Sequence, residues 1–188
     1  MNSGINGGVW GGLIAATFIT FITGIANQIR AALGLSYILG SSGTTSAVSS
    51  GTVETQLGSV AVPAGAMGAN GALRITAWWT YTNSGNNKTL RIRLGGAAGT
   101  IFWATVPTTT ANSQTQITIR NNNSASAQKV FLAGATSPYS ASATAPTTGA
   151  IDTSLATSVY ISGQTASGGE TITLESYTVE LIPGVPTP

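Results

Sequence analysis

Residues able to do chemistry are scarce in this chain and of few types. Its 188 residues include seven Lys or Arg and five Asp or Glu, and contain neither Cys nor His. Without Cys and His the chain cannot form a disulfide, a thiol nucleophile, a Cys/His zinc site or a Ser-His-Asp triad. Catalysis would have to use the Lys and Arg side chains and the carboxylates, which are Glu54, Asp152, Glu170, Glu175 and Glu180.

The spacing of these carboxylates does not favour a catalytic pair. Glu175 and Glu180 are five residues apart on one predicted strand, so a regular pleat puts them on opposite faces unless a bulge intervenes. Asp152 lies in the loop sequence GAIDTS, where Asp typically forms an Asx turn or caps a helix. The glycine-rich run at 95–100 lacks the Lys and the helix of a phosphate loop. We therefore expect a protein that is not an enzyme, with no catalytic residue, no cofactor and no metal site.

The basic residues are also few, and the net charge of +2 is too small to predict nucleic acid as a partner. Three of them, Arg74, Arg91 and Arg93, are predicted to share one face of a β-hairpin. They could be solvated strand-face charges or form intersubunit ion pairs with Glu175 or Glu180, and we favour these two interpretations. The alternative is contact with an anion or a glycan.

Adjacent aromatic residues indicate a second candidate surface. Trp78 follows its neighbour Trp79 directly, and Trp103 follows Phe102. Because successive strand residues point to opposite faces, one member of each pair should leave the core. An exposed Trp can stack on a sugar, but here we favour packing against a neighbouring subunit. The candidate surface or intersubunit contacts are thus Arg74, Trp78, Arg91, Arg93 and Trp103.

Short segments of alternating polarity occupy the chain from Leu57 onward. Residues 71–83 (GALRITAWWTYTN) and 89–96 (TLRIRLGG) are separated by the turn sequence NSGNNK, which predicts a hairpin. Further strands are predicted at 59–62, 100–106, 114–121, 128–133, 158–162 and 170–182, the last with a bulge near Glu175–Ser176. About eight strands predict a mainly β fold, a two-sheet jelly-roll-like sandwich of antiparallel strands.

The N-terminal segment has a different character, because residues 1–40 contain a single charge, Arg30. The run 9–26 is apolar enough to suggest a membrane helix, although Gly and Thr dilute it. Apolar residues also recur at steps of four, three and four, a spacing typical of a coiled-coil seam, and Ile there favours three or more strands. We favour a bundled or particle-buried helix over a membrane span. The predicted oligomerisation or anchoring residues are Trp10, Phe18, Ile22, Ile25 and Ile29.

These patterns divide the chain into four parts. Residues 1–40 form an apolar anchoring or oligomerisation arm that could be helical, and the Ser/Gly/Thr-rich residues 41–56 form a linker. Residues 57–183 form the jelly-roll-like domain, and 184–188 are a tail.

Residues 60–96, VAVPAGAMGANGALRITAWWTYTNSGNNKTLRIRLGG, resemble a segment common in structural proteins of tailed bacteriophages, where it opens a C-terminal jelly-roll-like domain. The resemblance continues more loosely to Tyr177–Pro183, and VWGG at 9–12 is similar to attachment regions of some phage fibre proteins. It implies a virion component, typically a homotrimer, whose N-terminus anchors it to other capsid or tail proteins while the β domain projects as a capsid decoration or head fibre.

Two other interpretations stay open. One is a tail-fibre-type protein that binds a receptor or a host surface glycan, and the other is a β domain anchored in a membrane. None of these three interpretations gives the β domain a catalytic role.

Overall fold

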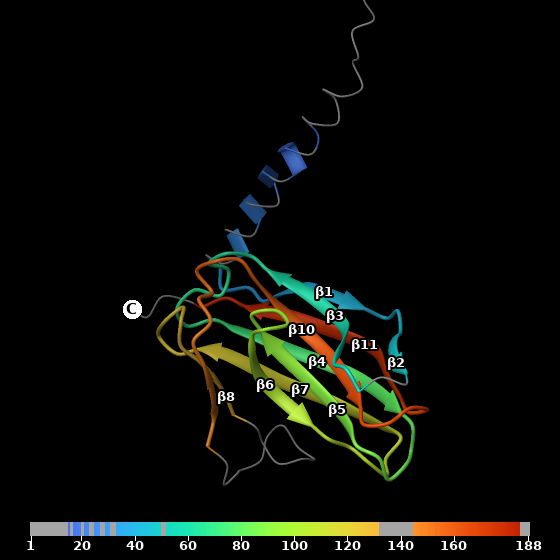
Figure 1. Ribbon diagram of the computed structural model, residues 1–188. Helices are drawn as coiled ribbons and strands as arrows, with labels where there is room; N and C mark the ends of the chain where they lie inside the picture. Colours follow the sequence, from blue (N-terminus) through green and yellow to red (C-terminus); the bar gives the residue numbers. More distant parts are fainter. Residues whose placement is uncertain are drawn as a thin grey trace, which may run out of the picture.

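The computed structural model describes residues 15, 17–19, 21–22, 25–26, 29–30, 33–49, 52–131 and 145–184. The described part is mainly β (Figure 1). Its strands are β1 (Tyr37–Ser42), β2 (Ser46–Ser49), β3 (Thr55–Val62), β4 (Ala72–Tyr81), β5 (Lys88–Leu94), β6 (Thr100–Thr105), β7 (Asn112–Asn121), β8 (Gln128–Val130), β9 (Thr147–Gly149), β10 (Thr157–Thr165) and β11 (Thr171–Ile182).

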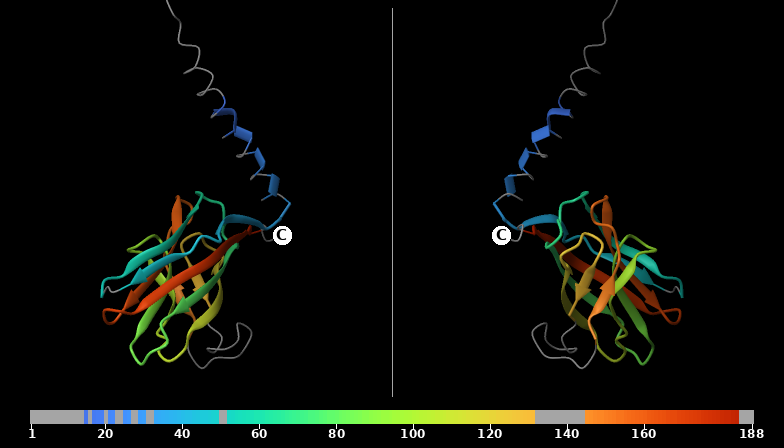
Figure 2. Two further views of the ribbon diagram at one scale, coloured as in Figure 1. Left: turned by 90° about the vertical axis from the view of Figure 1, so that its right-hand side faces the viewer. Right: turned by 90° about the vertical axis from the view of Figure 1, so that its left-hand side faces the viewer.

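The strands form two antiparallel sheets packed face to face (Figures 1 and 2). Sheet A has the order β1-β11-β4-β7-β8-β9, with β2 also paired to β11, and sheet B has the order β3-β10-β5-β6. If β1, β3, β4, β5, β6, β7, β10 and β11 are numbered one to eight, the sheet orders become 1-8-3-6 and 2-7-4-5. This is the strand order of a jelly roll, so the predicted fold class is confirmed. The short strands β8 and β9 extend sheet A beyond that frame.

The core lies between the sheets and follows the predicted alternation. On β4, Leu73, Ile75 and Trp79 are at most 1% exposed, while the alternate residues point outward. Sheet B supplies Leu90, Ile92 and Leu94 from β5, all fully buried. The predicted bulge in β11 is confirmed, because the register of β11 against β4 shifts between Leu174 and Ser176.

The predicted hairpin of residues 71–83 and 89–96 is wrong. β4 pairs with β11 and β7 in sheet A, whereas β5 pairs with β10 and β6 in sheet B. Residues 82–87 therefore cross from one sheet to the other. Alternation identifies the buried face of each strand but not its neighbours. The buried faces of β4 and β5 both point into the core, one from each sheet.

Strands also occupy the segment that we expected to be an arm end and a linker. β1 and β2 both pair with β11, so the jelly roll begins at Tyr37. Small residues serve a packing purpose here, since a Cβ on Gly40 would lie only 2.9 Å from Cγ1 of Val60 on β3. The closeness of these two edge strands accounts for a glycine at position 40, whereas a Cβ on Gly43 would meet nothing within 4 Å.

The described residues between 15 and 30 are helical and project away from the sandwich (Figures 1 and 2). The helix ends in a Schellman motif, in which the Leu35 N–H donates to the Arg30 carbonyl (2.9 Å) and Gly34 has a positive φ of 64°. The Arg30 guanidinium then lies 5.2 Å from the ring centre of Tyr37, the first residue of β1. Among the described residues, no helix has the length and apolarity needed to cross a membrane.

Candidate functional site

The helix presents apolar side chains to solvent. Phe18, Ile22, Ile25 and Ile29, the predicted seam, are between 38% and 62% exposed. Steps of three and four residues place them on one side of a helix. Trp10, the remaining residue predicted for anchoring, lies outside the described residues. Monomeric proteins rarely leave such a stripe uncovered, so the seam is a candidate assembly surface.

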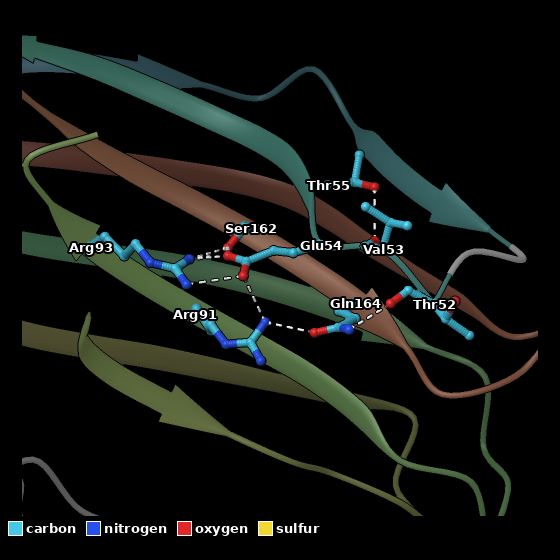
Figure 3. Close-up of polar contacts among 8 residues, drawn as sticks. All are labelled: Thr52, Val53, Glu54, Thr55, Arg91, Arg93, Ser162 and Gln164. Atoms are coloured by element: carbon cyan, nitrogen blue, oxygen red, sulfur yellow. Dashed lines mark hydrogen bonds and ion pairs between the residues drawn. The ribbon is translucent and has the colours of Figure 1, made fainter. Parts of the chain in front are cut away.

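A polar cluster lies on the outer face of sheet B (Figure 3). Arg91 and Arg93 are two residues apart on β5 and therefore point the same way, toward Glu54, which precedes β3. Arg91 Nη1 and Arg93 Nη2 each donate to Glu54 Oε2 at 2.9 Å, and Ser162 Oγ on β10 donates to Glu54 Oε1 at 2.5 Å. Gln164 accepts from Arg91 Nη1 at 2.9 Å. We call these five residues the Glu54 cluster.

The Glu54 cluster joins a loop to two strands and is more than a surface ion pair. The side chains of Arg93 and Arg91 are only 11% and 20% exposed. Two guanidinium groups share one carboxylate, so loss of that carboxylate would leave two close, partly desolvated cations. The geometry therefore supports a structural role, in holding the chain before β3 onto sheet B.

Glu54→Gln is expected to lower the free energy of unfolding by about 1–3 kcal/mol, because it removes charge-assisted hydrogen bonds from two largely buried arginines. Urea denaturation followed by fluorescence measures this. Arg74→Gln is the matched control. The Arg74 side chain is 44% exposed in its pair with Glu180, so its loss should cost less than about 1 kcal/mol. Equal losses in both variants would contradict the structural role of the cluster.

The residues predicted for a common contact surface are not brought together. Arg74 lies on sheet A and pairs with Glu180 of the same chain at 2.5 Å, whereas Arg91 and Arg93 lie on sheet B. The prediction of one basic face is therefore wrong, for the reason that the hairpin is wrong. Trp78 projects from the outer face of sheet A and is 37% exposed.

The second aromatic pair also differs from the prediction. Phe102 is fully buried and Trp103 packs against the core, so the two do not face opposite ways. The register of β5 against β6 shifts between Ile92 and Arg93, which lets consecutive residues of β6 reach the core. Trp78 on β4 and Trp103 on β6 belong to different sheets, so they share no surface.

A buried ion pair, missed in the sequence, closes one end of the sandwich. Lys88 is fully buried, and its Nζ lies 3.3 Å from Glu170 Oε2 and donates to Ser84 Oγ at 2.9 Å. Glu170 Oε1 accepts from Ser84 Oγ (2.8 Å) and from Asn86 Nδ2 (2.9 Å). Hydrogen bonds from Asn86 and Ser84, with help from Lys88, lower the pKa of Glu170. The pair locks the 82–87 crossover against the turn before β11.

Buried amides join the loops at the opposite end. Asn121 Nδ2 donates to the Gly68 carbonyl (2.7 Å) and to Thr153 Oγ1 (2.8 Å), while its Oδ1 accepts from Gln128 Nε2 (2.8 Å). Gln128 Oε1 accepts the Ile151 N–H at 2.9 Å. This network fastens part of the segment on which the phage resemblance depends. Long-range partners of this kind leave no spacing signal in the sequence.

The bulge in β11 brings Glu175 and Glu180 to the same outer face, but not to the same place. Glu175 accepts a hydrogen bond from Thr80, whereas Glu180 pairs with Arg74, six residues earlier on β4 and roughly 20 Å away along a strand. Hydrogen bonds from Ser36 and Arg74 lower the pKa of Glu180. The two carboxylates do not form an acid–base pair.

Fold and surfaces together define the described chain as a jelly-roll β-sandwich that carries an apolar helix at the start of its first strand. No protein-family model matches the chain, and neither does any curated protein sequence. Among solved structures, it is similar to "infectious bursal disease virus VP2 subviral particle" at 14% identity, covering 79% of this chain and 32% of that chain, with a TM-score of 0.38. The chain is also similar to the "infectious bursal disease virus Gx strain" structure, at 14% identity over 81% of this chain and 32% of that chain, with a TM-score of 0.37.

A third similar structure is "the CBM2 module of Lactobacillus casei BL23 phage J-1 evolved Dit", at 10% identity, 68% of this chain, 70% of that chain and a TM-score of 0.36. The chain spans about a third of the length of the two viral chains. The jelly-roll assignment depends on the strand order given above. These structural similarities carry no information about function.

Proposed function

We propose that this protein is a non-enzymatic structural component of a bacteriophage particle, a capsid decoration, head fibre or similar part. Its N-terminal helix attaches it to other virion proteins and to two further copies of itself, and its β domain projects. The observation that carries the proposal is the uncovered apolar seam on a helix that is joined, through the capped turn at residues 33–36, to a jelly roll.

The chemistry of the two parts supports a division of labour. The sandwich buries its own core and pairs most of its charges internally, as in the Glu54 cluster and the Lys88–Glu170 pair. The sandwich does not cover the seam of the helix, where Phe18, Ile22, Ile25 and Ile29 are 38–62% exposed. Permanent multichain interfaces bury apolar surface of this kind. The resemblance of residues 60–96 to phage structural proteins points to a virion as the place of assembly.

The test is incorporation into particles. The variant should lack residues 1–35, because a longer deletion would remove β1 and expose the edge of β11. We expect this variant to keep the melting temperature of the β domain and to be absent from purified particles, where the full-length protein is present. A matched variant with Phe131→Ala, an exposed aromatic of the β domain, should be incorporated normally. Wild-type incorporation of the deletion variant would contradict the anchoring role.

A further inference from the structure

The outer face of sheet A carries an exposed aromatic ring among polar side chains. Trp78 lies on β4, which is flanked by β11 and β7, and it is 37% exposed. Its cross-strand neighbours are Gln114 on β7 and Ser176 on β11. The indole therefore stands next to an amide on one side and a hydroxyl on the other.

The bulge in β11 adds a carboxylate at this position. Trp79 pairs with Leu174 and Trp78 with Ser176, so Glu175 is the extra residue of the bulge. Its Oε1 accepts a hydrogen bond from the hydroxyl of Thr80, which places the carboxylate on the outer face, at the residue two positions along β4 from Trp78. Bulges often redirect a side chain next to a functional site.

Glu175 differs from the other glutamates of the chain in its partners. Glu54, Glu170 and Glu180 each pair with Lys or Arg, whereas the Glu175 carboxylate, within the described part of the chain, accepts from the Thr80 hydroxyl. A carboxylate offers about four acceptor positions. Glu175 is thus a charged acceptor with capacity for further hydroxyl donors, on the same outer face as the Trp78 ring.

We propose that Trp78, Glu175 and Gln114 form a binding site for a neutral carbohydrate. A pyranose ring has an apolar C–H face, which can stack on the negative face of the indole, and hydroxyl groups around its rim. The carboxylate would accept charge-assisted hydrogen bonds from these hydroxyls, and the amide would both donate and accept. This proposal does not depend on the virion role.

Charge and polarity favour this ligand over the other candidates. The negative Glu175 disfavours sialylated or sulfated sugars at this position. The cations of the same face, Arg74, Arg120 and Lys129, lie toward the other end of β4 and β7, where Arg74 pairs with Glu180 and Arg120 donates to the Asn70 carbonyl. A second protein copy is the competing occupant. Around Trp78 this face carries Thr76, Thr80, Gln114 and Ser176, whereas the centre of a stable subunit interface is largely apolar.

The experiment uses the full-length protein on a printed array of neutral, sialylated and sulfated glycans, followed by calorimetric titration of the strongest neutral oligosaccharide. We expect binding to neutral glycans. Trp78→Ala and Glu175→Gln should each weaken affinity about tenfold or more, and Trp78→Phe should weaken it less. Phe131→Ala removes a more exposed aromatic, 76% exposed, from the position just after β8 and should leave affinity unchanged.

Three results would overturn the site. The first is that no neutral glycan binds above background. The second is that binding survives Trp78→Ala. The third is that Trp78→Ala changes the native mass, which would assign this face to a subunit contact. Melting temperatures show whether each variant remains folded. If Trp78→Ala does not fold, the affinity of Glu175→Gln decides, and unchanged affinity in that variant overturns the site. Failure here leaves particle incorporation untouched, so it is distinguishable from failure of the structural role.

Discussion

Full-length protein in buffer without detergent is expected to have a native mass near 56.7 kDa, three times the 18.9 kDa of one chain. The physical reason is the seam of Phe18, Ile22, Ile25 and Ile29, which is exposed in the single chain and has the spacing and Ile content of a bundle of three or more helices. Burying each such side chain stabilises the assembly by roughly 1.5–3 kcal/mol. Light scattering coupled to size-exclusion chromatography measures the mass.

Replacing the four seam residues by Gln should give a species of 18.9 kDa with an unchanged β domain, since Gln keeps the helix propensity but removes the apolar surface. The control removes exposed apolar residues elsewhere, with Ile101→Gln and Val106→Gln at β6 and the turn after it. That variant should keep the native mass of the full-length protein. A monomeric wild type, or protein that stays in solution only with detergent, would refute the trimeric seam.

The sequence predicts the faces of the strands well and their partners poorly. Alternation on β4 and β5 correctly identifies the buried sides, and the phase change in β11 correctly predicts a bulge at Glu175–Ser176. Both signals are local. The partner of β4 is not local, because the pattern of one strand does not say whether the next strand pairs beside it or crosses the core.

Composition misleads where a segment rich in Ser and Gly joins the edge of a sheet. Residues 41–49 lie within the predicted linker, yet they include the end of β1 and all of β2, because both strands pair with β11. The same limit applies to the candidate sites. Trp78 was recognisable as an outward-facing aromatic, whereas the partners of Arg74, Arg91 and Arg93 depend on which sheet each strand joins. Lys88, at the start of a strand after a polar turn, has the sequence context of an exposed residue and is instead fully buried.

The largest loss of stability from one substitution is expected for Glu170→Gln. It leaves the ammonium of Lys88, which is fully buried, with only the oxygens of Ser84 and a neutral amide. Unpairing a buried charge in this way is strongly destabilising, and we expect the melting temperature to fall by roughly 6–12 °C. Lys88→Met in the same background removes the unpaired ammonium and should recover much of the loss, because the two effects are coupled.

The Lys88–Glu170 pair makes the stability of the fold depend on pH under acidic conditions. Hydrogen bonds from Asn86 and Ser84 hold the pKa of Glu170 below its ordinary value of 4.5. A carboxyl with a lower pKa in the folded state contributes stability above about pH 4.5, and this contribution is lost as the pH falls further through the lowered pKa. Asp152 and Glu180, whose pKa values are also lowered, act in the same direction, so the comparison must be between variants. The difference in melting temperature between wild type and Glu170→Gln should therefore be constant near neutral pH and shrink below pH 4.5; a difference independent of pH would show that Glu170 does not stabilise the fold through its ionised form.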